Sequence, residues 1–323
     1  MIEGQQLEPF RLGVYFSERV WGRTNLAPWY NDVFSAPVGE SWLTGEQCLV
    51  ETGPHTGKRL AQLEQEAGEA LLGEECDHFP LLVKILFPQE KLSVQVHPND
   101  ADAALMGGSA QAKTECWYML QADPGANVAL GVKAGTTKAM IAEVLGTGAF
   151  EALLHKEPVA VGDLVYVEGG TIHAIYGGVV ILEVQQTSDT TYRLYDYGRP
   201  RELHLEDGMK VIKIKNGSGK IAPRISGPCT ELIAVKYFIV ERCEVSGTHH
   251  AFGSGSPECV VALAGQGVLV YGEARVDLQV GRAVVVPACC EEFSVEGECS
   301  FVRCRVPPRP GTLMLRETLT SMD

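Results

Sequence analysis

The spacing of apolar residues predicts short strands along most of this chain and helices in three segments. Residues 58–75 and 136–158 carry apolar side chains at helical spacing, and Asn99 and Asp100 are typical caps for a short helix over residues 101–106. The remaining apolar runs are short, rich in β-branched residues and separated by Gly and Pro. The pattern therefore favours a mainly β fold with a few helices.

Two of the predicted strands alternate apolar and polar side chains. After an apolar strand at residues 81–87, the side chains of residues 92–97 fall on two faces, with Leu92, Val94 and Val96 on one and Ser93, Gln95 and His97 on the other. Residues 113–120 form a further alternating strand, in which Lys113 and Glu115 share a face.

A loose pattern, G-x5-P-x-G-x2-H, occurs twice, each time with substitutions. The first copy consists of Gly162, Glu168, Gly170 and His173, and the second of Gly281, Pro287, Cys289 and Glu292. The pattern resembles the second motif of cupin β-barrels, in which a strand, a tight turn and a second strand present a metal-binding His. The first copy keeps the His, whereas the second has Glu292 in its place.

We therefore expect two cupin-type jelly-roll β-barrels, with the helices inserted around the first. A length of 323 residues fits roughly two units of about 150 residues. The expected boundary separates a catalytic, metal-binding domain at residues 1–225 from a degenerate domain without metal ligands at residues 226–323.

The formal net charge of −14 argues against nucleic acid and against an anionic membrane surface as partners. The apolar runs are far shorter than the roughly 20 residues of a membrane-spanning helix, and residues 1–20 do not have the pattern of a signal peptide. We therefore expect a cytoplasmic protein whose 10 cysteines are reduced and mostly buried. A zinc cluster or a disulfide framework is the alternative for the last third of the chain, which holds seven of them.

Four side chains form a candidate metal site. Gln95 and His97 share one strand face, Glu115 lies on the next predicted strand, and His173 follows the glycine turn. Two nitrogens and two oxygens suit a divalent transition ion, with Zn²⁺ first and Mn, Co or Fe as competitors. A single carboxylate leaves the site with a net charge near +1, so the ion stays a Lewis acid.

Basic side chains are expected around this site. Lys113 shares a face with Glu115, and Arg193 and Arg199 follow His173 closely enough to reach the same barrel mouth. Screening confines the effect of the overall charge to about 8 Å at physiological salt, so we expect a positive pocket in a negative protein. The alternative is that these are exposed, solvated charges.

The segments SVQVHPND, KTECWYML, GTIHAI and EVQQTSDTTYRLYDYGR, with GESW at 39–42 and Trp21-Gly22, resemble the type I mannose-6-phosphate isomerases of the short bacterial kind. The resemblance runs from about residue 10 to residue 305. It implies one Zn²⁺ per chain and the interconversion of mannose 6-phosphate and fructose 6-phosphate through a cis-enediol.

The resemblance also assigns roles to residues of this chain. It puts the metal ligands on Gln95, His97, Glu115 and His173, the catalytic arginine on Arg193 and the active-site aspartate on Asp189. Its lysine and serine fall on Lys113 and Ser93. We expect Lys113, Ser93 and Arg199 to hold the phosphate.

Because the chain departs from the family pattern in two places, the resemblance does not identify the general base. Larger members carry a His before the lysine, where this chain has Ala112, and a helical insertion that this chain lacks. The base is then Asp189, or Glu115 acting through metal-bound water. Two other functions compete with the isomerase, namely an iron-dependent cupin dioxygenase and a non-catalytic sugar-phosphate sensor. The sequence leaves the oligomeric state open.

Overall fold

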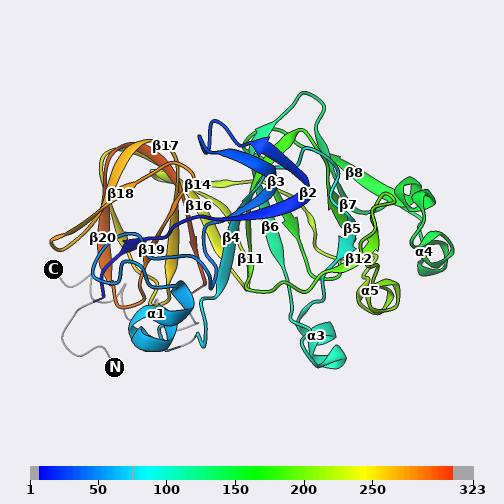
Figure 1. Ribbon diagram of the computed structural model, residues 1–323, viewed down its shortest axis with the longest axis horizontal. Helices are drawn as coiled ribbons and strands as arrows, with labels where there is room; N and C mark the ends of the chain where they lie inside the picture. Colours follow the sequence, from blue (N-terminus) through cyan, green and yellow to red (C-terminus); the bar gives the residue numbers. More distant parts are fainter. Residues whose placement is uncertain (1–6, 75, 308–323) are drawn as a thin grey trace. The chain divides into compact units, whose positions relative to one another are not determined.

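The computed structural model describes residues 7–74 and 76–307, and the chain divides into two compact units (Figure 1). We call the first the site unit, because its segments Phe16–Trp42 and Leu82–Ala222 contain all the predicted site residues. The second unit combines Met1–Tyr15 and Leu43–Leu81 with Pro223–Asp323. The predicted division of roles between residues 1–225 and residues 226–323 stays a prediction.

The site unit contains two β-sheets. The seven-stranded sheet has the order β13-β9-β6-β11-β4-β3-β2 and the five-stranded sheet the order β12-β5-β10-β7-β8. The strands of the larger sheet are β2 (Tyr15–Asn25), β3 (Val33–Trp42), β4 (Leu81–Leu86), β6 (Glu115–Ala122), β9 (Leu164–Val167), β11 (Val179–Gln186) and β13 (Gly219–Ile221). Those of the smaller sheet are β5 (Val94–Val96), β7 (Asn127–Val132), β8 (Leu154–Pro158), β10 (His173–Ile175) and β12 (Tyr192–Tyr195).

Alternation along β5 directs its side chains to the two faces of the five-stranded sheet. Val94 and Val96 pack with Ile141 and Val211 of helices α4 (Lys138–Val144) and α5 (Leu205–Val211), which lie on one side of the five-stranded sheet (Figure 1). A separate core joins the two sheets and contains Trp117 among other residues. The polar side chains of the β5 segment therefore face the space between the sheets.

Most predicted elements are confirmed. The segment at 58–75 forms helices α1 (Leu60–Ala67) and α2 (Glu69–Leu72), which are separated by Gly68 at a φ of +50°. Asn99 caps helix α3 (Asp100–Met106) by accepting a hydrogen bond from the backbone N–H of Asp102. Residue 75 lies outside the described residues.

Two local predictions are wrong. The helical segment at 136–158 ends with the short 3₁₀ helix η1 (Gly148–Leu153), and residues 154–158 form β8 instead, because they pair with β7 and bury Leu154. Leu92 precedes β5 and packs in the core between the sheets rather than beside Val94. In both cases pairing or packing across the fold overrides the local pattern.

The second unit is built on one eight-stranded sheet. Its order is β1-β19-β17-β20-β16-β15-β14, with β18 paired to β17. The strands are β1 (Phe10–Arg11), β14 (Arg224–Ser226), β15 (Cys229–Ala234), β16 (Ile239–Phe252), β17 (Glu258–Tyr271), β18 (Ala274–Leu278), β19 (Ala283–Val286) and β20 (Glu292–Arg305). The mainly β architecture is thus confirmed, although hydrogen bonds between the described strands leave the sheets open rather than closed into barrels.

Both copies of the glycine pattern form a strand, a turn and a strand. The first joins β9 to β10 through Gly170 at a φ of +98°, and the second joins β19 to β20. His173 is buried at the start of β10, whereas Glu292 is exposed at the start of β20. The same local backbone therefore carries a buried imidazole in one unit and a solvated carboxylate in the other.

The expectation that all cysteines are reduced is wrong for one pair. Cys229 and Cys243 form a disulfide because they lie directly opposite each other on β15 and β16, with their Cα atoms 4.1 Å apart. Eight cysteines are free. None of the helices in the described residues is long and apolar enough to cross a membrane.

Candidate active site

The four predicted metal ligands converge between the two sheets of the site unit. Gln95 on β5 lies directly opposite His173 on β10, and His97 directly follows β5. Glu115 begins β6 in the seven-stranded sheet. The turn before His173 packs tightly on the end of the β5 segment, because a Cβ on Gly169 would lie 2.8 Å from the Cα of Asn99.

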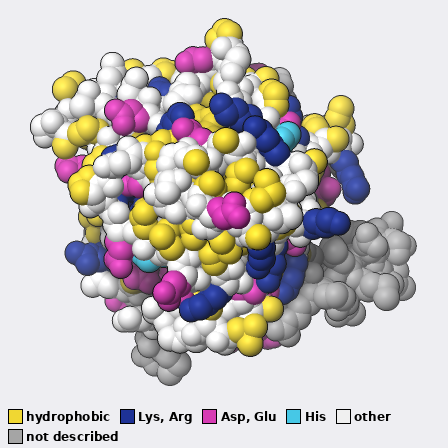
Figure 2. Space-filling model, turned by 90° about the vertical axis from the view of Figure 1, so that its right-hand side faces the viewer, with side chains coloured by type: hydrophobic (Ala, Val, Ile, Leu, Met, Phe, Trp, Pro, Cys, Tyr) yellow, Lys and Arg dark blue, Asp and Glu magenta, His cyan; other side chains and the backbone are white. Residues whose placement is uncertain are grey.

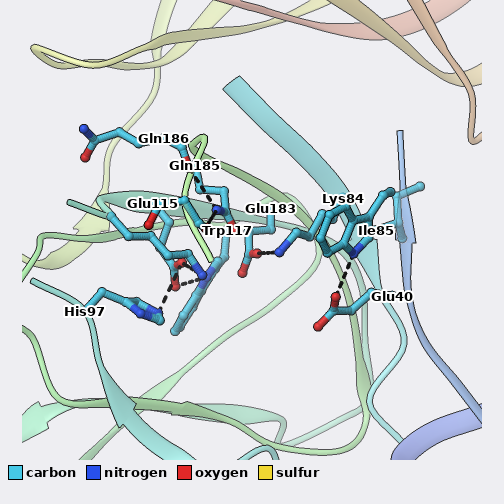
Figure 3. A network of polar contacts seen from close by, with 12 residues as sticks. Glu40, Lys84, Ile85, His97, Glu115, Trp117, Glu183, Gln185 and Gln186 are labelled. Atoms are coloured by element: carbon cyan, nitrogen blue, oxygen red, sulfur yellow. Dashed lines mark hydrogen bonds and ion pairs between the residues drawn. The ribbon is translucent and has the colours of Figure 1, made fainter. Parts of the chain in front are cut away.

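The donor atoms of three ligands face one another at short distances. His97 Nε2 lies 3.7 Å from Glu115 Oε2, and His173 Nε2 lies 3.5 Å from Glu115 Oε1. All three side chains are almost fully buried, and Figure 3 shows His97 pointing at the Glu115 carboxylate. This cluster has the chemistry and spacing of a divalent metal site.

Hydrogen bonds to backbone carbonyls orient the two histidine rings of the cluster. The Nδ1 atoms of His97 and His173 lie 2.7 Å from the carbonyl of Thr190 and 2.9 Å from the carbonyl of Thr171. A donated Nδ1–H leaves each Nε2 as a lone pair directed at the cluster. His97 Nε2 is buried and has no hydrogen-bond partner among the described residues. These residues therefore fit a bound metal ion.

Gln95 occupies the edge of the cluster. Its Nε2 lies 3.2 Å from His173 Nε2, and its Oε1 accepts a hydrogen bond from the Ser93 hydroxyl at 3.2 Å. A half-turn of the amide would place Oε1 toward the cluster, which is the orientation that a metal ligand needs.

Lys113 neutralises the ligand carboxylate. Its Nζ lies 2.9 Å from Glu115 Oε2, and both side chains are buried. Burial by itself would raise the pKa of Glu115, but the charge of Lys113 outweighs it and lowers that pKa far below its ordinary value. Burial and the charge of Lys113 lower the pKa of His97, so its ring is neutral, as a metal ligand must be.

A second buried ion pair, which the sequence did not reveal, lies beside the cluster. Lys84 Nζ on β4 is 3.6 Å from Glu183 Oε1 on β11, and Figure 3 shows the pair between Glu115 and Glu40. Burial and the nearby Glu115 carboxylate raise the pKa of Glu183 to about 7. The signal for both was a charged residue inside an apolar strand, LLVKIL for Lys84 and VVILEVQQ for Glu183.

A cavity of about 520 Å³ lies beside the cluster, and Gln95, Lys113, Lys84 and Glu183 are part of its lining. Its charged lining consists of Arg19, Lys84, Lys113, Arg193 and Arg201 with Glu18, Glu40, Glu183 and Asp189. Basic residues thus outnumber acidic ones by one in a chain of net charge −14. On the face turned to the viewer in Figure 2, basic side chains also lie among acidic ones, so the excess negative charge does not form a uniform surface.

Of the two predicted arginines, only Arg193 lines the cavity. Arg193 on β12 lies opposite Gln95 and lines the cavity, where its Nε is buried without a hydrogen-bond partner among the described residues. Arg199 is absent from the lining and donates hydrogen bonds to Asp196 and to the carbonyl of Lys91. Arg201 lines the cavity instead and donates two 2.7 Å hydrogen bonds to Asp196.

The remaining predicted residues also lie at the cavity. Ser93 and Lys113 contribute to its lining, but each already has a partner, in Gln95 and Glu115 respectively. Asp189 lines it from an exposed position. The structure therefore brings together eight of the nine predicted site residues, and Arg199 alone points elsewhere.

A two-sheet cupin-type unit with a buried His-Glu-His cluster defines a class of metal-dependent enzymes, and comparison with known proteins identifies the family. Residues 10–129 match the catalytic domain of type I phosphomannose isomerase, and residues 229–306 match the cupin domain of mannose-6-phosphate isomerase. Mannose-6-phosphate isomerase ManA of Bacillus subtilis is 36% identical over 312 residues, covering 90% of this chain and 98% of its own length. The enzyme of Streptococcus mutans is 33% identical, covering 91% of this chain and 97% of its own length.

Solved structures agree with the sequence comparison. The mannose 6-phosphate isomerase of Bacillus subtilis superposes with a TM-score of 0.83 at 30% identity, covering 93% of this chain and all of its own. A mutant phosphomannose isomerase from Salmonella typhimurium, at 17% identity and a TM-score of 0.79, shares the fold. The chain belongs to the type I mannose-6-phosphate isomerases, a metal-dependent family.

Substitution of either cluster histidine should abolish binding of the divalent ion. We expect His97→Ala and His173→Ala to lose one equivalent of bound divalent ion relative to the parent protein, because two of the three closely spaced donors then remain. Elemental analysis after gel filtration measures the loss. His155→Ala is the control, since His155 is exposed on β8. Retention of that equivalent in both cluster variants would contradict the assignment.

Proposed function

We propose that this chain interconverts mannose 6-phosphate and fructose 6-phosphate through a cis-enediol, with Zn²⁺ as its metal. Family membership supports the reaction, and the observation that carries the site is the buried cluster of His97, Glu115 and His173. The cluster adjoins a cavity that Gln95 and Lys113 line. With Gln95, the three cluster residues would hold the ion, and two nitrogens with two oxygens suit Zn²⁺. The bound ion supplies Lewis-acid charge at the sugar oxygens.

Isomerisation moves a proton between C2 and C1 of the open-chain sugar. A base must reach both carbons, and positive charge must face the oxygens on which negative charge develops. Arg193 fills the second role in this proposal, because it lies opposite the ligand Gln95 and has a buried Nε without a hydrogen-bond partner. Its guanidinium can donate directly to the enediolate.

We propose Glu183 as the base that carries the proton. It is buried, lines the cavity and has a pKa raised to about 7 by burial and the Glu115 carboxylate. Glu115 is already engaged by Lys113 and faces two histidines, and Asp189 is exposed. Asp189, which the family pattern assigns to the site, is the competing candidate.

The phosphate group is assigned to the arginine end of the cavity. Arg201 lines the cavity with a partly exposed guanidinium, whereas Arg199 does not line it. We therefore favour Arg201 over Arg199, with Ser93 and Lys113 completing the polar lining. The cytoplasmic location and the catalytic role of residues 1–225 remain parts of the proposal.

A coupled assay of mannose 6-phosphate turnover, with and without EDTA, tests the reaction. The isomerase forms fructose 6-phosphate without consuming oxygen and loses activity when EDTA removes the metal. A dioxygenase would consume oxygen, and a sugar-phosphate sensor would bind without turnover. Either of those results, or full activity after metal removal, would exclude the proposed isomerase.

Arg193→Ala should lower kcat by about 10²–10³-fold, or about 3–4 kcal/mol, the usual loss when a transition-state charge stabiliser is removed. Steady-state kinetics measure the change, with Arg275→Ala as the control because Arg275 is an exposed residue of the second unit. Unchanged turnover in Arg193→Ala would rule out this role.

Glu183→Gln tests the base through the pH profile. A base must be ionised, so kcat/KM should rise with pH through about 7, where Glu183 loses its proton. In Glu183→Gln, kcat/KM should no longer rise with pH through about 7 and should be lower by about 10²–10⁴-fold. Asp189→Asn is the matched comparison, and if it loses this rise while Glu183→Gln keeps it, Asp189 is the base.

A further inference from the structure

A second group of metal-binding side chains lies in the second unit. Cys229 on β15 and Cys243 on β16 are directly opposite, and His249 lies six residues farther along β16. Their ligand atoms all lie within 4.8 Å of one another. No residue of this group belongs to the active-site cluster.

Three paired glycines lie on the strands between Cys243 and His249. Gly247 on β16 pairs with Gly297 on β20, which also pairs with Gly267 on β17, and the first two have φ values of +98° and +123°. Six residues of straight strand would separate His249 from Cys243 by about 20 Å. The strand bends instead, and His249 Nε2 lies 3.6 Å from Cys229 Sγ.

The distance between Cys229 Sγ and His249 Nε2 matches that between two ligands of one zinc ion, and the two sulfurs, which are bonded to each other here, would separate on reduction. Tetrahedral zinc with Zn–S of about 2.3 Å and Zn–N of about 2.0 Å holds sulfur and nitrogen about 3.6 Å apart. Cys243 lies in the apolar core of the sheet, with Cys229 packed against it.

The disulfide excludes zinc, because neither sulfur is then a thiolate. A dithiol reductant can transfer two electrons and two protons to the Cys229–Cys243 bond and itself become a disulfide. The two thiols then release their protons as the metal binds. We propose that Cys229, Cys243 and His249 form a zinc site that exists only in the reduced protein, with water in the fourth position.

Cobalt distinguishes this site from the active site. Thiolate ligands give Co²⁺ a near-ultraviolet charge-transfer band, and the active-site ligands contain no sulfur. The protein is reduced with a phosphine, which becomes phosphine oxide by taking the oxygen of one water molecule while the two sulfurs gain its hydrogens. After removal of the reagent without air, Co²⁺ is added in stoichiometric steps.

The reduced parent protein should show the band, and the oxidised protein should not. Cys229→Ser should abolish it, and His249→Ala should weaken cobalt binding by more than about 10-fold, the least that loss of an outer-shell partner costs. His250→Ala is the matched control, since His250 is the exposed neighbour of His249. His97→Ala, which removes an active-site ligand, should keep the band.

Absence of the band in the reduced parent protein would overturn the proposal. So would a band that survives in Cys229→Ser, because it would then belong to other thiols such as the adjacent Cys289 and Cys290. Circular dichroism checks the fold of each variant. If Cys229→Ser does not fold, His249→Ala decides, because it leaves both thiols in place, and cobalt binding as tight as in the parent would reject the site.

Discussion

The burial of the Glu115 carboxylate is the constraint on which the site unit depends. An ionised carboxylate in a protein interior costs several kcal/mol unless charged and hydrogen-bonding partners surround it. The fold supplies Lys113 from just before β6 and Trp117 Nε1 at 3.0 Å, with His97 from the end of the β5 segment and His173 from β10. Removing one of these partners would leave the others as buried polar groups without compensation. The cluster is therefore a condition of the packing as much as a feature of the chemistry.

The buried Glu115 carboxylate also affects the charged residues that line the cavity. Glu183 lies near Glu115, and two carboxylates in a dry environment cannot both ionise easily, which contributes to the raised pKa of Glu183. Lys84 lies between Glu183 and Glu40 as their common counter-charge (Figure 3). A row of alternating charges thus joins the metal ligands to the cavity wall. It lets a chain of net charge −14 offer a small anion a locally basic pocket, because the nearby charges act at close range while the distant ones are screened.

The strand-turn-strand motif occurs in both units, but it does not by itself determine which ligands each unit can bind. In the site unit the motif ends in His173, which packs against Trp117 and the ligand cluster. In the second unit it ends in Glu292, which is exposed, and a different group, buried Cys243 with half-buried Cys229 and His249, comes together. The paired Gly247 and Gly297, both with positive φ, lie on the strands between Cys243 and His249. Side chains at a few inward positions, rather than the backbone motif, set what each unit can bind.

The sequence alone determined the mainly β class, the short helices, and the shared face of Gln95 and His97, because period-two alternation and capping depend only on neighbouring residues. It also predicted Gln95, His97, Glu115 and His173 as metal ligands, and the structure brings these four side chains together. The tertiary structure decided that Arg201 rather than Arg199 lines the cavity, that Lys84 meets Glu183, and that Cys229 meets Cys243 and His249. Those contacts join residues from different strands, so they depend on register, strand bending and the packing of one sheet on another, which no local pattern encodes.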